Sequence, residues 1–166
     1  MIEHDYILAV DPDIKKSGVA LLNVSKKCVH EYCLSFPKLM DKLQNLKYDK
    51  KNVLVVVEAG WMNNSNWHLT SCKSKAMAAK IGNNTGRNHE TGHKIVEMAL
   101  HYGLNVAEYK PLKKCWNGHE GKITKEELEY ITGQPSKGNQ DVRDAVLLAW
   151  CVAGFPIRGK VGLGNK

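Results

Sequence analysis

Two short apolar runs that each end in an acidic residue constrain this chain most strongly. The first, Tyr6–Asp11, is followed by a proline, which ends a strand. The second, Asn52–Glu58, contains five consecutive apolar residues at Val53–Val57, the pattern of a central parallel strand covered on both faces. Because α/β proteins place their sites at strand ends, Asp11 and Glu58 are the first candidate site residues.

Further β-rich and helical segments alternate along the chain. We expect strands at Val19–Val24, Cys28–Phe36 and Leu104–Tyr109, and helices at Lys38–Lys47, Lys125–Thr132 and Gln140–Ala153. Together they predict an α/β fold, a mixed five-stranded sheet flanked by helices. A single domain is expected over residues 1–155, followed by a Gly-rich basic tail at 156–166 that is predicted to be mobile.

The sequence predicts an interrupted helix in the middle of the chain. Ser71 is a candidate N-cap for a helix from Cys72 to about Ile81. The segment Gly82–Gly86 weakens this helix, because glycine is a poor helix former, and helix is expected to resume as far as about Tyr102.

The positive charge of the chain is uneven. There are 24 Lys and Arg residues against 17 Asp and Glu, a formal charge of +7. Ala59–His89 contains four basic residues and Tyr109–His119 contains three, and neither stretch contains an acid. Acid-free basic stretches indicate a polyanionic partner, with nucleic acid favoured over a membrane surface, although a solvated surface would give the same pattern.

Composition also excludes several classes of protein. No apolar run approaches the ~20 residues that span a bilayer, and the first residues lack the basic and apolar regions of a signal peptide. Five cysteines without a CxxC pair fit a reducing compartment better than a disulfide framework. The sequence therefore predicts a cytoplasmic protein with no membrane segment.

Two more acids lie on the last predicted helix. Asp141 and Asp144 are three residues apart, so they share a face, and the rest of this helix is apolar and must pack on the sheet. Both would then point toward Asp11 and Glu58. Each acid alone has an ordinary explanation, as a turn, a strand edge or a helix N-terminus. Four clustered carboxylates instead need cations, and two Mg²⁺ ions in such a cluster catalyse phosphodiester hydrolysis.

Three segments resemble the motifs of RuvC-type Holliday-junction resolvases. ILAVDPDIKKSGVALL resembles the first motif, VLVVVEAGW the second, and QDVRDAVLLAW the last, an Asp-x-x-Asp-Ala helix. GLNVAEYKP is similar to the strand that precedes the family's basic loop. The resemblance runs from about Tyr6 to Ala153, with the motifs in the family's order.

The resemblance implies a ribonuclease-H-like fold, cleavage of four-way or branched DNA junctions and a homodimer. It also implies Mg²⁺ as cofactor, with two ions expected and Mn²⁺ as a substitute. It assigns the catalytic and metal-binding roles to a set of four acids, Asp11, Glu58, Asp141 and Asp144. It assigns a base-stacking role to Trp61, the aromatic residue three positions after Glu58.

The chain also departs from the family pattern. Asp13 stands where the family usually has glycine, and we expect it to be a turn residue. The stretch Lys80–Gly92 is longer than in the bacterial housekeeping enzymes, which indicates a divergent branch such as a phage or mobile element. For the dimer interface we predict the apolar face of Ile95–Leu104.

The remaining DNA contacts are predicted from charge and aromatic character. Trp61 and Trp67 lie beside several amides in one loop, a composition suited to stacking on unpaired bases. Basic residues are expected to contact phosphates or stabilise charge in the transition state. The predicted set is Trp61, Lys73, Lys80, Arg87, Lys110, Lys113, Lys114, Lys122 and Lys125.

Two alternative functions stay open at this point. His89-Glu90-Thr91-Gly92-His93 matches HExxH, in which two histidines bind zinc and the glutamate acts as base, as in zinc peptidases. Glu97 and Glu108 are possible third ligands, but Gly92 weakens the helix within the motif. The other alternative is a junction-binding protein that has the same fold and no catalytic activity.

Overall fold

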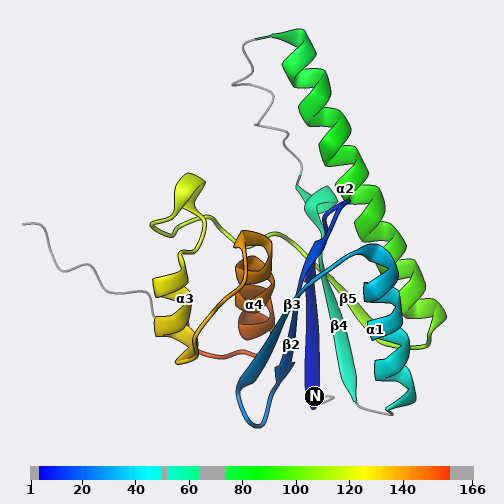
Figure 1. Ribbon diagram of the computed structural model, residues 1–166, viewed down its shortest axis with the longest axis vertical. Helices are drawn as coiled ribbons and strands as arrows, with labels where there is room; N and C mark the ends of the chain where they lie inside the picture. Colours follow the sequence, from blue (N-terminus) through cyan, green and yellow to red (C-terminus); the bar gives the residue numbers. More distant parts are fainter. Residues whose placement is uncertain (1–3, 50–51, 64–73, 158–166) are drawn as a thin grey trace, which may run out of the picture.

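The computed structural model describes residues 4–49, 52–63 and 74–157 (Figure 1). Five strands form one sheet in the order β3-β2-β1-β4-β5. The pairs β1–β2 and β2–β3 are antiparallel, whereas β1–β4 and β4–β5 are parallel. The strands are β1 Tyr6–Asp11, β2 Ser17–Asn23, β3 Cys28–Leu34, β4 Val53–Glu58 and β5 Asn105–Tyr109. The prediction of a mixed five-stranded sheet is therefore confirmed.

Helices cover both faces of this sheet (Figure 1). On one face α1 (Phe36–Tyr48) and α2 (Lys75–His101) pack, and on the other α3 (Lys125–Thr132) and α4 (Gln140–Val152). Alternate residues of β1 separate the two cores. Leu8 contributes to the core under α1 and α2, and Ala9 to the core under α4, with no exposed surface on either side chain. This explains why the two central strands read as continuous apolar runs.

The long helix α2 differs from the prediction. It is one continuous helix of 27 residues, with no break at Gly82–Gly86. Ser74 is its N-cap and accepts a hydrogen bond from the backbone N–H of Met77; the predicted cap, Ser71, lies outside the described residues. Each glycine costs a helix only about 1 kcal/mol relative to alanine, and the unbroken backbone hydrogen bonding on either side outweighs that cost.

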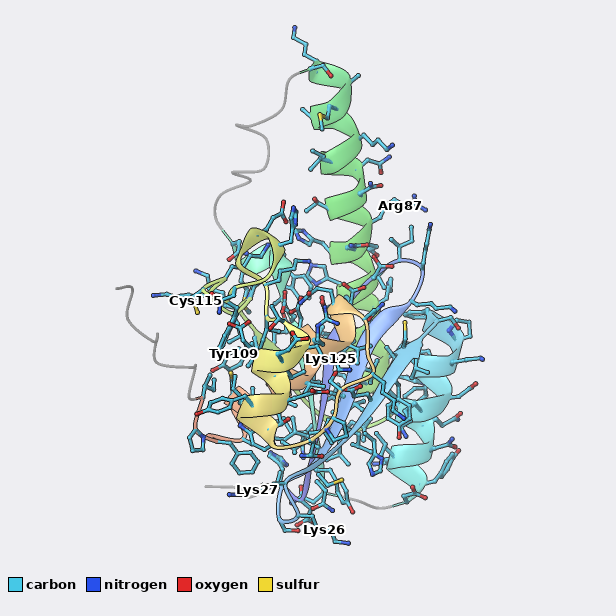
Figure 2. All side chains as sticks on the ribbon, turned by 60° about the vertical axis from the view of Figure 1, so that its left-hand side comes forward. Lys26, Lys27, Arg87, Tyr109, Cys115 and Lys125 are labelled. Carbon is cyan, nitrogen blue, oxygen red and sulfur yellow. The ribbon has the colours of Figure 1, made fainter. Side chains whose placement is uncertain are left out.

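The two halves of α2 have different surroundings. Figure 2 shows Arg87 on the part of the helix that projects beyond the body of the protein. The C-terminal half instead lies on the sheet, where Ile95 and Ala99 are fully buried and Leu104 beyond the helix is 8% exposed. The apolar face predicted as a dimer interface is thus occupied by the chain's own core, and that prediction is wrong. Apolar residues that recur every 3.6 positions identify the buried face of a helix, but they do not show which element covers that face.

Some predicted features lie outside the described ranges. Lys73 and Trp67 belong to them, as does the predicted tail apart from Pro156 and Ile157. Within the described part of the chain, no helix is both long and apolar enough to cross a bilayer.

Candidate metal and nucleic-acid site

The parallel pairing of β1 and β4 brings the first two acids together. Val10 pairs with Val57, so Asp11 and Glu58 follow side by side at the same edge of the sheet. The alternation along each strand turns both side chains toward the face covered by α4, the face to which Ala9 also contributes. The positions predicted from the strand ends are confirmed, and the two acids share one face.

A glycine lets α4 approach this edge closely. Gly18 of β2 pairs with Asp11, and a Cβ atom at this position would overlap the backbone carbonyl of Asp141. The first turn of α4 therefore lies directly on the strand beside Asp11. Asn139 caps this turn and accepts a hydrogen bond from the backbone N–H of Val142. Glycine at position 18 thus sets how near the helix acids come to the strand acids.

The four acids lie close enough together to repel one another electrostatically. Burial raises the pKa of Asp11 well above its usual range, and the charges of Glu58, Asp141 and Asp144 raise it further. Burial, followed by the charge of Asp144, raises the pKa of Glu58 to about 7. Burial is also the largest cause of the raised pKa values of Asp141 and Asp144. The cluster therefore holds more negative charge than its surroundings stabilise.

The donor set of this cluster fits hard divalent cations. All four side chains offer carboxylate oxygens, which Mg²⁺ prefers, and a bound cation would offset the repulsion that raises their pKa values. Among the residues that the structure describes, however, no group of three or more Asp, Glu, His or Cys side chains is arranged so that it could hold a metal ion. Mg²⁺ usually keeps several water ligands and binds through one or two carboxylates, so an open acidic site is compatible with it.

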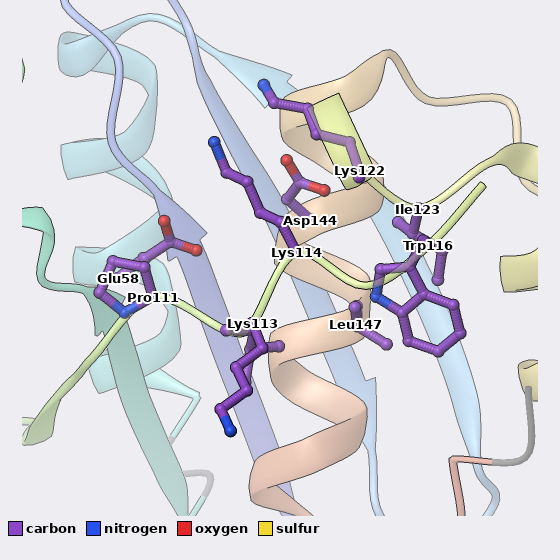
Figure 3. A pocket seen from close by; sticks show the side chains of 11 residues that line it. Glu58, Pro111, Lys113, Lys114, Trp116, Lys122, Ile123, Asp144 and Leu147 are labelled. Atoms are coloured by element: carbon purple, nitrogen blue, oxygen red, sulfur yellow. The ribbon is translucent and has the colours of Figure 1, made fainter. Parts of the chain in front are cut away.

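Two lysines complete the site on the loop between β5 and α3. Lys114 and Lys122 line a small pocket together with Glu58 and Asp144, while the Lys113 side chain extends in another direction (Figure 3). The positive charge of Lys122 lowers the pKa of all four acids, and Lys114 lowers that of Glu58. The sequence named these lysines as candidates, and the structure distinguishes them from Lys113.

Sequence reasoning missed two polar residues of α4. Gln140 donates one hydrogen bond to Oδ1 of Asp144 (2.8 Å) and another to the carbonyl of Ile123 (3.2 Å). Arg143 donates to Oε1 of Gln140 (2.8 Å) and to the carbonyl of Gly138 (2.9 Å). Gln140 thus orients one site acid and ties it to the residue after Lys122. The i,i+4 spacing of Gln140 and Asp144 on a helix is the signal that could have revealed it.

Comparison with known proteins locates this arrangement among solved folds. No family model and no curated protein sequence matches the chain. The structure of Thermus thermophilus RuvC in complex with Holliday junction substrate is similar, with a TM-score of 0.51 and 16% identity over 91% of this chain and 97% of that chain. A Thermus thermophilus RuvC structure matches with a TM-score of 0.52 and 17% identity over 90% of this chain and 97% of that chain.

The chain has the RuvC fold. The predicted ribonuclease-H-like architecture, with strand order 3-2-1-4-5 and flanking helices, is therefore confirmed. At 16–17% identity the likeness establishes the fold, while the roles of individual residues have to be argued from this chain.

The turn after β1 also differs from the family motif in a way the structure explains. Oδ1 of Asp13 accepts hydrogen bonds from the backbone N–H groups of Lys15 (2.8 Å) and Lys16 (3.3 Å). Asn88 of α2 accepts a hydrogen bond from the backbone N–H of Ile14 through its side-chain oxygen (3.1 Å). Asp13 is thus the turn residue that the sequence predicts, and it lies close enough to raise the pKa of Asp141.

In this RuvC fold Trp61 is docked on α2. Its ring lies 4.0 Å from that of His93 between centroids, and a Cβ atom at Gly92 would lie 2.5 Å from it. The indole N–H donates a hydrogen bond to Oε2 of Glu108 on β5 (2.9 Å). Trp61 is thus partly buried against the core, and a base-stacking role for it stays a prediction.

Among the described residues, the HExxH sequence does not assemble a zinc site. His89 and His93 both contact Trp61, and no third His, Cys, Asp or Glu joins them within the described ranges. Of the two proposed third ligands, Glu97 pairs with Lys94 and Glu108 binds the indole of Trp61. The motif match reflects packing between α2 and the loop after β4.

The other predicted DNA contacts that the structure describes lie in three places. The loop between β5 and α3 carries Lys110, Lys113, Lys114 and Lys122, and the last three line the pocket that contains Glu58 and Asp144. Lys80 and Arg87 lie exposed on α2, where it projects from the body. Lys125, at the start of α3, lies 3.8 Å from Glu129. These residues stay candidates for phosphate contact.

Proposed function

We propose that this protein is a Mg²⁺-dependent endonuclease that cuts four-way or branched DNA junctions. The observation that carries this proposal is the cluster of Asp11, Glu58, Asp141 and Asp144, half-buried at one edge of the sheet beside Lys122. The RuvC fold supports it, because a solved protein with this fold was captured with a Holliday junction substrate. The four acids are proposed to be the metal ligands and the catalytic centre.

The chemistry is hydrolysis of a phosphodiester bond. Two bound Mg²⁺ ions would stabilise the attacking and leaving oxygens. The oxygen of a water molecule joins phosphorus, the bond from phosphorus to the 3′-oxygen breaks, and a proton is transferred to that oxygen. The products are a 5′-phosphate and a 3′-hydroxyl. Mn²⁺ is expected to substitute for Mg²⁺.

The residues of this chain have separate tasks in that reaction. The carboxylates would hold the cations and orient the attacking water, and Gln140 keeps Asp144 in place through its 2.8 Å hydrogen bond. The ammonium groups of Lys114 and Lys122 bind phosphate oxygens and stabilise the charge that develops on them. The exposed basic residues of the loop and of α2 contribute phosphate contacts that position the DNA.

We further infer a homodimer that acts in the cytoplasm during DNA recombination or repair. Resolving a four-way junction requires two symmetric cuts, and a two-fold dimer provides two active sites with the matching symmetry. The face of Ile95 is buried within one chain, so the interface must use other surface. Light scattering of the purified protein measures the oligomeric state, and a strict monomer that resolves junctions would contradict the dimer.

A cleavage assay tests the proposal. A synthetic four-way junction and a linear duplex of the same sequence are incubated with the protein at varied Mg²⁺ concentration. We expect Mg²⁺-dependent nicks at symmetric positions in the junction and none in the duplex. Binding to the junction without cleavage, with Mg²⁺ or Mn²⁺ present, would instead support a non-catalytic junction-binding protein.

A further inference from the structure

The loop that carries the site lysines is held by one buried carboxylate. Glu127 of α3 is 9% exposed, and its side chain bonds both ends of the segment from Asn117 to Thr124. Oε1 accepts hydrogen bonds from the side chain (2.7 Å) and the backbone N–H (3.2 Å) of Asn117. Oε2 accepts one from the backbone N–H of Thr124 (3.0 Å).

This clamp lies next to Lys122 along the backbone. The N–H of Gly118 donates to the carbonyl of Lys122 (2.9 Å), and the N–H of Lys122 donates to the carbonyl of His119 (3.2 Å). Asn117, which Glu127 holds, directly precedes Gly118 and His119, the two residues that bond Lys122. The position of Asn117 is therefore linked to the backbone of Lys122 through these two hydrogen bonds.

The charge state of Glu127 suits this task. Burial works against ionisation, but the hydrogen bonds from Thr124 and Asn117 outweigh it, and the pKa of Glu127 lies below its usual value. An ionised acceptor makes shorter and stronger hydrogen bonds than a neutral one. The same carboxylate also completes the capping box of α3 with Thr124, so one side chain has two separable functions.

We propose that Glu127 and Asn117 are positioning residues that hold Lys122 over the four-acid site. Neither residue touches the DNA or the acids in this role, and both act through the loop backbone. The proposal rests on the function proposed above, since it assigns Lys122 to the reaction. It predicts that removing the side-chain hydrogen bond from Asn117 to Glu127 slows cleavage without weakening the binding of junction DNA.

The two functions of Glu127 can be separated by a matched pair of variants. Asn117→Ala removes the side-chain bond of the clamp (2.7 Å), keeps the bond of the Asn117 backbone N–H, and leaves the capping box of Thr124 and Glu127 in place. Thr124→Ala removes the side chain that accepts from the Glu127 N–H (3.2 Å) and leaves both bonds of Asn117. Single-turnover cleavage, junction affinity and melting temperature are then measured for both variants and for the wild type.

We expect Asn117→Ala to cut about ten- to a hundredfold more slowly, the effect of losing a hydrogen bond to a charged group, with junction affinity unchanged within about twofold. Thr124→Ala should lower the melting temperature and leave the cleavage rate of the folded protein within about twofold of wild type. In a Lys122→Ala background, Asn117→Ala should cause little further loss, because both changes act through one ammonium group.

Two outcomes would overturn the positioning role while leaving the proposed function in place. The first is an Asn117→Ala protein that cuts as fast as wild type. The second is an effect of Asn117→Ala that is equally large with and without Lys122. A wild-type protein that fails to cut the junction in the same assay would overturn the proposed function itself, and the positioning role with it.

Discussion

The acids and the lysines of this site are held in different ways. Asp11 and Glu58 end two paired strands, and Asp141 and Asp144 lie on a helix that packs on Gly18, so regular secondary structure fixes all four. Lys114 and Lys122 lie on a loop that has no regular pairing of its own. Two side chains hold that loop: Glu127 accepts hydrogen bonds from it, and Gln140 donates one to it.

This difference separates two tasks that a metal-dependent nuclease must perform. A cation site needs ligands at fixed separations, which strands and helices provide. A group that contacts a bound nucleic acid must admit a large ligand, and loops allow this at the cost of positional precision. We therefore expect changes in the acid half to abolish cutting and changes in the lysine half to reduce it.

Removing an acid should have the largest effect. Asp11→Asn, Glu58→Gln, Asp141→Asn and Asp144→Asn should each slow junction cleavage by more than the ~10–100-fold that follows the loss of an outer-shell partner of a metal ligand. Junction binding should be largely kept, because the basic surface provides it. Gel-shift and nicking assays on the same preparations measure both properties. A variant with near-wild-type nicking would show that the substituted acid is not a ligand.

Gly18→Ala tests whether secondary structure positions the helix acids. The added Cβ overlaps the backbone carbonyl of Asp141, so α4 must move, and we expect the free energy of unfolding to fall by about 3 kcal/mol or more. Gly82→Ala is the matched control, because a Cβ there meets no atom within 4 Å and should leave the protein unchanged or stabilise it by up to ~1 kcal/mol. Equal effects of the two substitutions in urea unfolding would refute the close approach of α4 to β2.

The electrostatic strain of the acid cluster predicts a dependence of stability on pH. Burial raises the pKa of Glu58 from 4.5 to about 7, so the folded protein binds this proton more tightly than the unfolded chain. The resulting stabilisation is complete below the unfolded value and is lost as pH rises to about 7, amounting to roughly 3 kcal/mol at ~1.4 kcal/mol per pKa unit.

Urea unfolding of the metal-free protein at pH 5 and pH 8 measures this loss. Glu58→Gln cannot ionise, so its stability should fall less over the same range. If Glu58→Gln and the wild type lost the same stability between these pH values, Glu58 would not be a strained member of the cluster.

The smallest effect is expected at Trp61, which follows Glu58 by three residues. Trp61→Ala should reduce junction cleavage by at most the ~1–3 kcal/mol equivalent of one base–aromatic stack, and Trp61→Phe should restore much of it. Because the ring packs on Gly92 and His93, Trp61→Ala should also lower the melting temperature. If Trp61→Ala melts well below wild type but cuts normally when folded, the ring serves packing alone.

The acid half of the site could be predicted from the sequence because its signals are local. An apolar run identifies a buried strand, and a run that ends in an acid places that acid at a strand end. Two acids three residues apart on an apolar helix share a face. Once the strand order is known, these local signals bring all four acids together.

The lysine half could not be predicted, because side-chain contacts between distant segments determine it. Thr124 and Glu127 have the spacing of a capping box, but the bond from Asn117 to the same carboxylate joins a loop residue to a residue of α3 ten positions later. The docking of Trp61 depends on a contact with Glu108 across 47 residues. The continuity of α2 through Gly82 depends on a small balance of helix propensities, which a pattern of glycines does not settle.

If the four acids form a cation site, Mg²⁺ should raise the melting temperature of the protein in the absence of DNA. At pH 8 and constant ionic strength, Mg²⁺ at ten times its dissociation constant should stabilise the wild type by about 1.4 kcal/mol, a rise of roughly 3–6 °C in melting temperature. Asp11→Asn should lose most of this rise. A wild-type protein whose melting temperature does not respond to Mg²⁺, or an equal rise in the Asp11→Asn variant, would contradict a cation site formed by the four acids.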